Sequence, residues 1–160
     1  MFCRGALAAR EPLGGGGFRR AGFDMERREF KKTIESILRD DPRYAVGAYV
    51  FVRMGLDFAV KRACAEDRSR CDRHVSAKEL LEAIRVFALE TFGPMAKPLF
   101  DEWGVRGCED IGEIVFNLVD AGALRKNDDD KIEDFSGGYD FYEAFVLPFK
   151  PRGRRRRCAG

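Results

Sequence analysis

The stretch of residues 109–149 constrains the fold most, because a helix, a glycine stop and a hairpin pattern follow one another in it. Its first part repeats apolar residues at helical spacing and ends at Gly122, a residue that tolerates the backbone conformation of a helix terminus. After that stop, the pattern predicts a strand over residues 124–126, a turn over 127–130 and a returning strand over 132–135. The order predicts the second half of a winged helix.

The preceding residues supply the other helices of such a module. Ser76 and Glu79 have the spacing of a capping box, in which each side chain satisfies a free backbone N–H of the other residue. The helix that they begin is predicted to end at Gly93 and Pro94. A short helix is predicted over residues 94–103.

Two further helices are predicted before this body. Apolar residues from Phe30 to Leu38 recur on one helical face, which predicts a helix over residues 26–39. Asp41 and Pro42 form a cap and a first-turn proline, and so predict that the next helix starts there and runs to about residue 63. A strand over residues 49–52 is the alternative, although the length of the apolar stretch favours a helix.

The sequence therefore predicts a mainly α fold with a small β hairpin, in which two packed helices precede a winged-helix-like body. Residues 25–151 are expected to form a single globular domain. Residues 1–24 contain four arginines and four consecutive glycines, and we interpret them as a disordered leader or as the product of a start codon assigned too far upstream. Residues 152–160 are expected to be a disordered basic tail.

The charge is strongly segregated along the chain. Residues 1–74 carry a net charge of +5, residues 75–150 carry −8 and residues 151–160 carry +5. The face of a winged helix that would enter a DNA groove here contains only acids, namely Glu109, Asp110, Glu113 and Asp120. Such a face repels a nucleic-acid backbone, so DNA binding through it is not expected.

Basic residues in the tail suggest a different contact. They are Arg152, Arg154, Arg155, Arg156 and Arg157. A cluster of this density can bind nucleic acid or an acidic surface through counterion release, or can keep the protein soluble as a disordered end. No membrane partner is expected, since no run of about 18 uncharged apolar residues occurs. The five irregularly spaced cysteines favour a reducing cytosol over a disulfide framework.

Cysteines and one histidine provide two candidate sites. Cys64, Cys71, His74 and Cys108 could together close a tetrahedral zinc site, but their spacing matches no known zinc motif, and ordinary loop residues are the alternative. Cys108 also precedes a helix, where backbone N–H groups could lower the pKa of its thiol and produce a reactive thiolate. The alternative is a small residue that fills the cap position.

Two other clusters stand near the predicted wing. The acids Asp128, Asp129, Asp130, Glu133 and Asp134 could bind calcium, but they lack the spacing of an EF-hand loop, and a solvated turn is the favoured interpretation. Aromatic residues follow, namely Tyr139, Phe141, Tyr142, Phe145 and Phe149. They are expected to pack on the core, or to form an anchor patch for a protein partner if several rings are exposed.

Three runs of the sequence carry a resemblance to known proteins: HVSAKELLEAIRVFALETFGPMAKPLFDEWGV, EDIGEIVFNLVDAGAL and DFSGGYDFYEAFVLPFKP. Together they resemble a small bacterial protein family of unknown function, the Minf-type family. The resemblance covers roughly residues 25–151 and implies no activity, substrate or catalytic residue. From the residues themselves we expect a non-enzymatic module that binds a protein partner through its winged-helix-like domain. The alternative is a nucleic-acid-associated protein that uses the arginine tail. No cofactor is expected, and no convergent group of residues indicates an enzyme.

Overall fold

The computed structural model describes residues 27–66, 75–124 and 131–151. Six α-helices and three 3-10 helices make up its regular structure, and no strand is present in these ranges. Their bounds are α1 Arg27–Asp40, α2 Val46–Glu66, α3 Ala77–Phe92, η2 Gly93–Met95, α4 Ala96–Glu102, α5 Cys108–Asp120, η3 Ile132–Phe135, α6 Phe141–Phe145 and η4 Leu147–Phe149. The prediction of a mainly α fold is confirmed.

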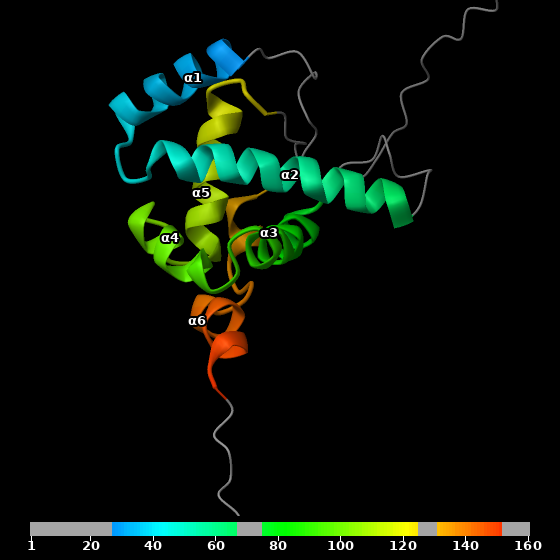
Figure 1. The fold of residues 1–160 in the computed structure, drawn as a ribbon. Helices are drawn as coiled ribbons and strands as arrows, with labels where there is room; N and C mark the ends of the chain where they lie inside the picture. Colours follow the sequence, from blue (N-terminus) through cyan, green and yellow to red (C-terminus); the bar gives the residue numbers. More distant parts are fainter. Residues whose placement is uncertain (1–26, 67–74, 125–130, 152–160) are drawn as a thin grey trace, which may run out of the picture.

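Helix α2 is the centre of the arrangement. It crosses α5, with α1 on one side of it and α3 and α4 on the other (Figure 1). Tyr49, Val52 and Leu56 are buried along one side of α2. Gly55 allows α3 to approach closely, because a Cβ at this position would lie 2.8 Å from Cγ1 of Ile84. Large substitutions at Gly55 would therefore separate the two helices.

The start of α2 differs from the prediction. Residues 42–44 form a turn, and the helix begins at Val46 instead of at Pro42. The Asp41 carboxylate does not cap the helix, because it accepts hydrogen bonds from the backbone and the guanidinium of Arg43. Helix α2 also includes residues 49–52, so the alternative of a strand there is wrong.

The signals for α3 and α5 are confirmed. Ser76 accepts a hydrogen bond from the Glu79 N–H, and the Glu79 carboxylate accepts one from the Ser76 N–H at 3.0 Å. Gly93 ends α3 with a φ of 52°, and Gly122 follows α5 with a φ of 74°. Glycine adopts these left-handed values without the steric cost that a Cβ would add.

The predicted returning strand over residues 132–135 is wrong, because these residues form the 3-10 helix η3. Their backbone makes local hydrogen bonds, for example from the Ser136 N–H to the Glu133 carbonyl at 2.9 Å. The Phe135 side chain is fully buried against α5, where Gly112 leaves room for its ring. Burial of this one ring, rather than pairing with a strand, holds the segment in place. The predicted turn over residues 127–130 lies outside the described residues.

Candidate interaction surfaces

The predicted zinc ligands are not brought together in the part of the chain that the structure describes. Cys64 lies near the end of α2 and is disulfide-bonded, so it is not available as a thiolate ligand and departs from the expectation of reduced cysteines. Cys108 lies at the start of α5. Cys71 and His74 are outside the described residues. Within the described ranges no three His, Cys, Asp or Glu side chains are positioned to hold a metal ion.

Cys108 has the environment of a core residue. Its thiol is buried, donates to the Tyr139 carbonyl at 3.4 Å and accepts from the Tyr139 N–H at 3.4 Å. Burial raises the pKa of the Cys108 thiol, and the neighbouring Glu109 carboxylate raises it further. This shift is opposite to the one that a reactive thiolate requires. The cap position itself is occupied by Gly107.

The residues of the predicted calcium cluster divide between two parts of the chain. Asp128, Asp129 and Asp130 lie outside the described residues. Glu133 and Asp134 belong to η3, and the Asp134 carboxylate accepts a hydrogen bond from the Lys131 N–H at 3.1 Å. Asp134 therefore stabilises the first turn of η3.

The aromatic patch is mainly core. Phe141 and Phe145 are buried, and their rings lie 5.3 Å and 5.1 Å from that of Phe100 in α4. The Tyr139 hydroxyl donates to the Leu81 carbonyl at 3.2 Å, and burial raises the pKa of this tyrosine. Of the five aromatic residues expected to pack on the core or to form a patch, Tyr142 and Phe149 are exposed. Packing on the core is thus the correct interpretation for the other three.

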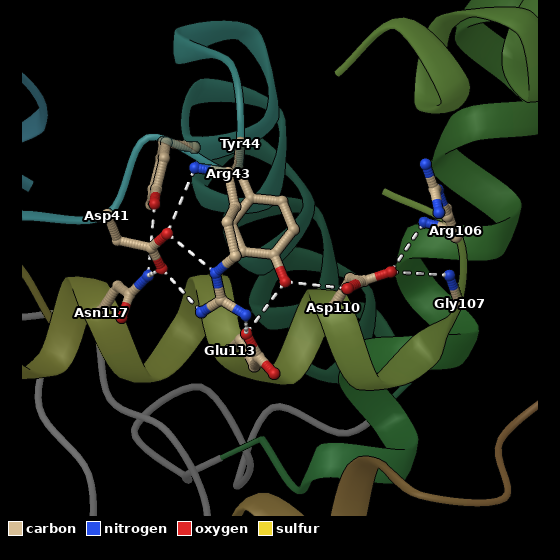
Figure 2. Close-up of polar contacts among 9 residues, drawn as sticks. Asp41, Arg43, Tyr44, Arg106, Gly107, Asp110, Glu113 and Asn117 are labelled. Carbon is tan, nitrogen blue, oxygen red and sulfur yellow. Dashed lines mark hydrogen bonds and ion pairs between the residues drawn. The ribbon is translucent and has the colours of Figure 1, made fainter. Parts of the chain in front are cut away.

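Most acids of the α5 face contact groups inside the protein (Figure 2). The Asp110 carboxylate accepts hydrogen bonds from the N–H groups of Arg106 and Gly107, at 2.7 Å and 3.1 Å. Its other oxygen lies 2.8 Å from the Tyr44 hydroxyl, which also lies 3.0 Å from the Glu113 carboxylate. The acids therefore join the start of α5 to the turn that precedes α2.

Arg43 and Asn117 extend this network toward α1. The Arg43 guanidinium binds Asp41 at 2.7 Å and Glu113 at 2.5 Å. The Asn117 amide donates to the Asp41 carboxylate and to the Tyr49 hydroxyl, each at 3.2 Å. The hydrogen bond from Arg43 is the main reason that the pKa of Asp41 falls to about 2. The network is thus a link between α1, α2 and α5, formed by residues far apart in the sequence.

Two open hollows lie beside the network. One is lined by Arg43, Asn117, Lys131 and their neighbours, and the other by Arg106, Cys108 and residues 137–140. Both linings contain acids, and Asp110 and Glu113 among them accept hydrogen bonds from the protein itself. These two carboxylates therefore have partners within the protein and help to join α5 to the turn before α2.

A surface that the sequence did not reveal runs along α2. Val46, Val50 and Met54 follow one another at a spacing of four residues and are 44%, 39% and 49% exposed. This spacing places them on one line of the helix, opposite the buried Ala48 and Val52. We call these three residues the outer face of α2. The sequence shows that α2 is apolar on several sides, and only packing shows which side has no cover among the described elements.

Trp103 lies next to this surface. Its indole Nε1 is 2.6 Å from the position that a Cβ of Gly47 would take, so the absence of a side chain at Gly47 lets the ring lie against α2. The Trp103 ring also contacts Phe51 and Phe92, at centroid distances of 5.8 Å in both cases. Trp103 is half-buried and adds an aromatic edge beside the outer face of α2.

Comparison of this chain with protein-family models, with curated proteins and with solved structures finds no match. The resemblance to the Minf-type family thus stays a prediction. In the described ranges, no helix has both the length and the apolar character needed to cross a membrane. The five arginines of the predicted basic tail lie outside those ranges.

Proposed function

We propose that this protein is a non-enzymatic module that binds another protein through the outer face of α2. The observation that carries the proposal is the exposure of Val46, Val50 and Met54 on the central helix of the fold. Exposed apolar residues are common when scattered singly, but a line of them on one helix is a feature of interaction sites. Water would be displaced from this line when a partner covers it.

The geometry fits a helical or groove-shaped partner. Val46 and Met54 are eight residues apart, which corresponds to about 12 Å along a helix. Apolar anchors at this spacing are typical of a helix that binds in the groove of another protein. The Trp103 ring lies against α2 at Gly47, next to Val46 in the sequence. Tryptophan is frequent at the centre of protein interfaces.

The acids of α5 are a less suitable contact surface. Asp110 and Glu113 accept hydrogen bonds from other groups of the protein, so a partner would have to compete for them. The winged-helix likeness is proposed only for the order of α3, α4 and α5, since residues 132–135 are helical. Protein binding through the outer face of α2 does not depend on a wing.

The experiment compares the full chain with two variants as bait in affinity purification. The double variant Val50→Lys, Met54→Lys places two charges on the outer face of α2. The control Ile132→Lys makes the same kind of change at a residue that is 40% exposed in η3. A partner that binds the unchanged chain and the control, and binds the double variant at least about tenfold more weakly, supports the proposal.

Light scattering on the purified chain separates a foreign partner from a second copy. If the chain is a dimer and the double variant is a monomer, the partner is the protein itself. Equal binding of a partner to all three proteins would refute the outer face of α2 as the contact. Circular dichroism with a thermal melt checks that each variant folds.

A nucleic-acid-associated protein is the second candidate, and it rests on the charge of Arg152 and of residues 154–157. Replacement of all five arginines by glutamine should abolish binding to an oligonucleotide if they supply the affinity. Unchanged binding would refute this candidate. The slope of affinity against salt concentration gives the number of phosphate contacts.

A further inference from the structure

The outer face of α2 includes one chemically reactive side chain, the thioether of Met54. This residue is 49% exposed and is the most exposed member of the face. The side chains of Val46 and Val50 are hydrocarbons and have no atom that a peroxide oxidises. A peroxide converts a thioether to a sulfoxide, which is polar. The apolar line on α2 thus has one member whose polarity can change without a change of sequence.

The backbone around Met54 is held in place by the fold. Met54 lies inside the helix Val46–Glu66, so its backbone N–H and carbonyl have helical partners. The next residue, Gly55, is buried against α3, where a Cβ would lie 2.8 Å from Cγ1 of Ile84. Successive side chains of a helix differ in direction by about 100°, so the Met54 side chain is exposed although Gly55 is buried. A reaction at the Met54 sulfur therefore changes the surface and leaves the core unchanged.

We propose that Met54 is a site of reversible oxidation, which switches the outer face of α2 between an apolar and a polar form. This inference rests on the function proposed above, because it concerns regulation of the same surface. The oxidant is a hydroperoxide, with hydrogen peroxide as the simplest case. The sulfur lone pair attacks one peroxide oxygen, a sulfur–oxygen bond forms and the oxygen–oxygen bond breaks. The second oxygen takes the proton of the first and leaves as water, so the sulfur is oxidised by two electrons and the peroxide is reduced.

The reverse reaction restores the apolar form. A pair of thiols supplies two electrons and two protons, the sulfoxide oxygen leaves as water and the thiols become a disulfide. Methionine sulfoxide reductases catalyse this step, with one enzyme for each epimer of the sulfoxide. Met54 is accessible to such enzymes as well as to the oxidant, because its side chain is half-exposed on a helix surface. Oxidation at this residue can therefore be undone without refolding.

The sulfoxide oxygen should weaken binding of a partner. It is a hydrogen-bond acceptor, and a partner that covers the outer face of α2 would bury it. A partner surface that fits the apolar line has no donor for this oxygen, so the acceptor loses its water without compensation. Burial of one such acceptor corresponds to a loss of affinity of about tenfold or more. Val46 and Val50 stay apolar, so the loss is graded and reversible.

Met95 provides a control within the same chain. It is the other methionine of the described ranges and is 58% exposed. Met95 lies in η2, between α3 and α4, and not on the line of Val46, Val50 and Met54. Its thioether should be oxidised at a rate similar to that of Met54. The two methionines therefore share exposure to the oxidant and differ in their position relative to the outer face of α2.

The test repeats the affinity purification with the full chain and with the variants Met54→Leu and Met95→Leu, each before and after treatment with hydrogen peroxide. Peptide mass spectrometry measures the sulfoxide at each methionine. Each protein is compared with itself, so a change in its basal binding does not affect the result. We expect peroxide to weaken partner binding about tenfold or more for the unchanged chain and for Met95→Leu, and less than about twofold for Met54→Leu.

Two further treatments test reversibility and specificity. Methionine sulfoxide reductases with dithiothreitol should restore binding of the oxidised chain, whereas dithiothreitol alone should not. The second arm is needed because dithiothreitol can also reduce the disulfide of Cys64. Met54→Leu retains all cysteines, including the buried Cys108, and so accounts for any reaction of peroxide with thiols.

The possible failures are distinguishable. A partner that is held equally well by the oxidised chain refutes the switch and leaves protein binding through α2 intact. Equal losses in the unchanged chain and in Met54→Leu assign the effect to another residue and refute the role of Met54. No partner for the untreated chain refutes the proposed function and the switch with it. A thermal melt of the oxidised chain should match that of the untreated chain, and loss of the folded state would show damage instead of a switch.

Discussion

Asn117 provides the sharpest test of the network between α1, α2 and α5. Its amide donates one hydrogen bond to the ionised Asp41 and another to the buried Tyr49 hydroxyl. The change Asn117→Asp keeps the shape of the side chain but replaces both donors by acceptors and adds a negative charge. The new carboxylate would lie where the amide is now, 3.2 Å from an oxygen of Asp41.

The expected loss of stability follows from three contributions. The hydrogen bond from the Asn117 amide to the ionised Asp41 contributes about 2 kcal/mol to the free energy of unfolding. Repulsion between carboxylates about 4 Å apart costs about 4 kcal/mol at an effective dielectric constant of about 20, and Arg43, which binds Asp41, offsets roughly half of it. The hydrogen bond with Tyr49 is exchanged rather than lost, because the Tyr49 hydroxyl can turn to donate to the new carboxylate. The free energy of unfolding should therefore fall by about 4 kcal/mol near pH 7.

The pH dependence distinguishes this account from a simple packing defect. The pKa of Asp41 is about 2 in the folded protein against 3.8 ordinarily, so its contribution is present above pH 3.8 and is lost as the pH falls through 2. The introduced carboxyl next to Asp41 has a raised pKa, so its destabilising effect is present at neutral pH and decreases as that group becomes protonated. At about pH 4.5 the difference from the unchanged protein should be roughly halved.

Urea unfolding followed by circular dichroism at both pH values measures the difference. The control Asn117→Ala removes the same two bonds without a charge, and should cost about 3 kcal/mol with little change between the two pH values. A loss below about 0.5 kcal/mol for Asn117→Asp at pH 7 would show that the amide does not hold these helices together. The same loss at both pH values would refute the electrostatic reasoning.

Three other predictions concern close packing, the thiol and the cap. Gly112→Ala should destabilise the protein by about 1–2 kcal/mol in urea unfolding, because the new Cβ would lie 2.8 Å from Cβ and Cγ of Phe135. Alanine favours a helix over glycine, so equal or higher stability would contradict this contact. Cys108 should react with iodoacetamide much more slowly in the native protein than in urea, because the thiol is buried and its pKa is raised. Peptide mass spectrometry measures the two rates, and equal rates would contradict the burial of this thiol. Ser76→Ala should lower the free energy of unfolding by about 1 kcal/mol, and by less in a protein that already carries Glu79→Ala, because the two side chains cap one another. Additive losses would argue against the capping box.

The sequence could predict those parts of the fold that depend on local chemistry. Ser76 and Glu79 act across one helical turn, and Gly93 and Gly122 satisfy a backbone conformation at a single residue. Such signals work without knowledge of the rest of the chain, so the bounds of α3 and α5 followed from them. The spacing of apolar residues in α1 belongs to the same group.

Tertiary structure decided the features that depend on which groups meet. Asp41 and Pro42 have the local character of a helix start, but the guanidinium of Arg43 binds the Asp41 carboxylate and α2 begins later. The apolar pattern of residues 132–135 also suits a strand, yet burial of Phe135 against Gly112 and local backbone bonds produce a 3-10 helix. In both cases a nonlocal or competing contact outweighed a weak propensity.

The candidate surfaces show the same division. Composition and spacing identify α2 as apolar, and the arginines of residues 154–157 are visible in the sequence alone. The exposure of Val50 and of Leu147 cannot be read from the sequence, because it depends on which sides of α2 and η4 the other elements cover. Sequence determines how much apolar surface a helix carries, and only the packing of the whole chain determines how much of it is left for a partner.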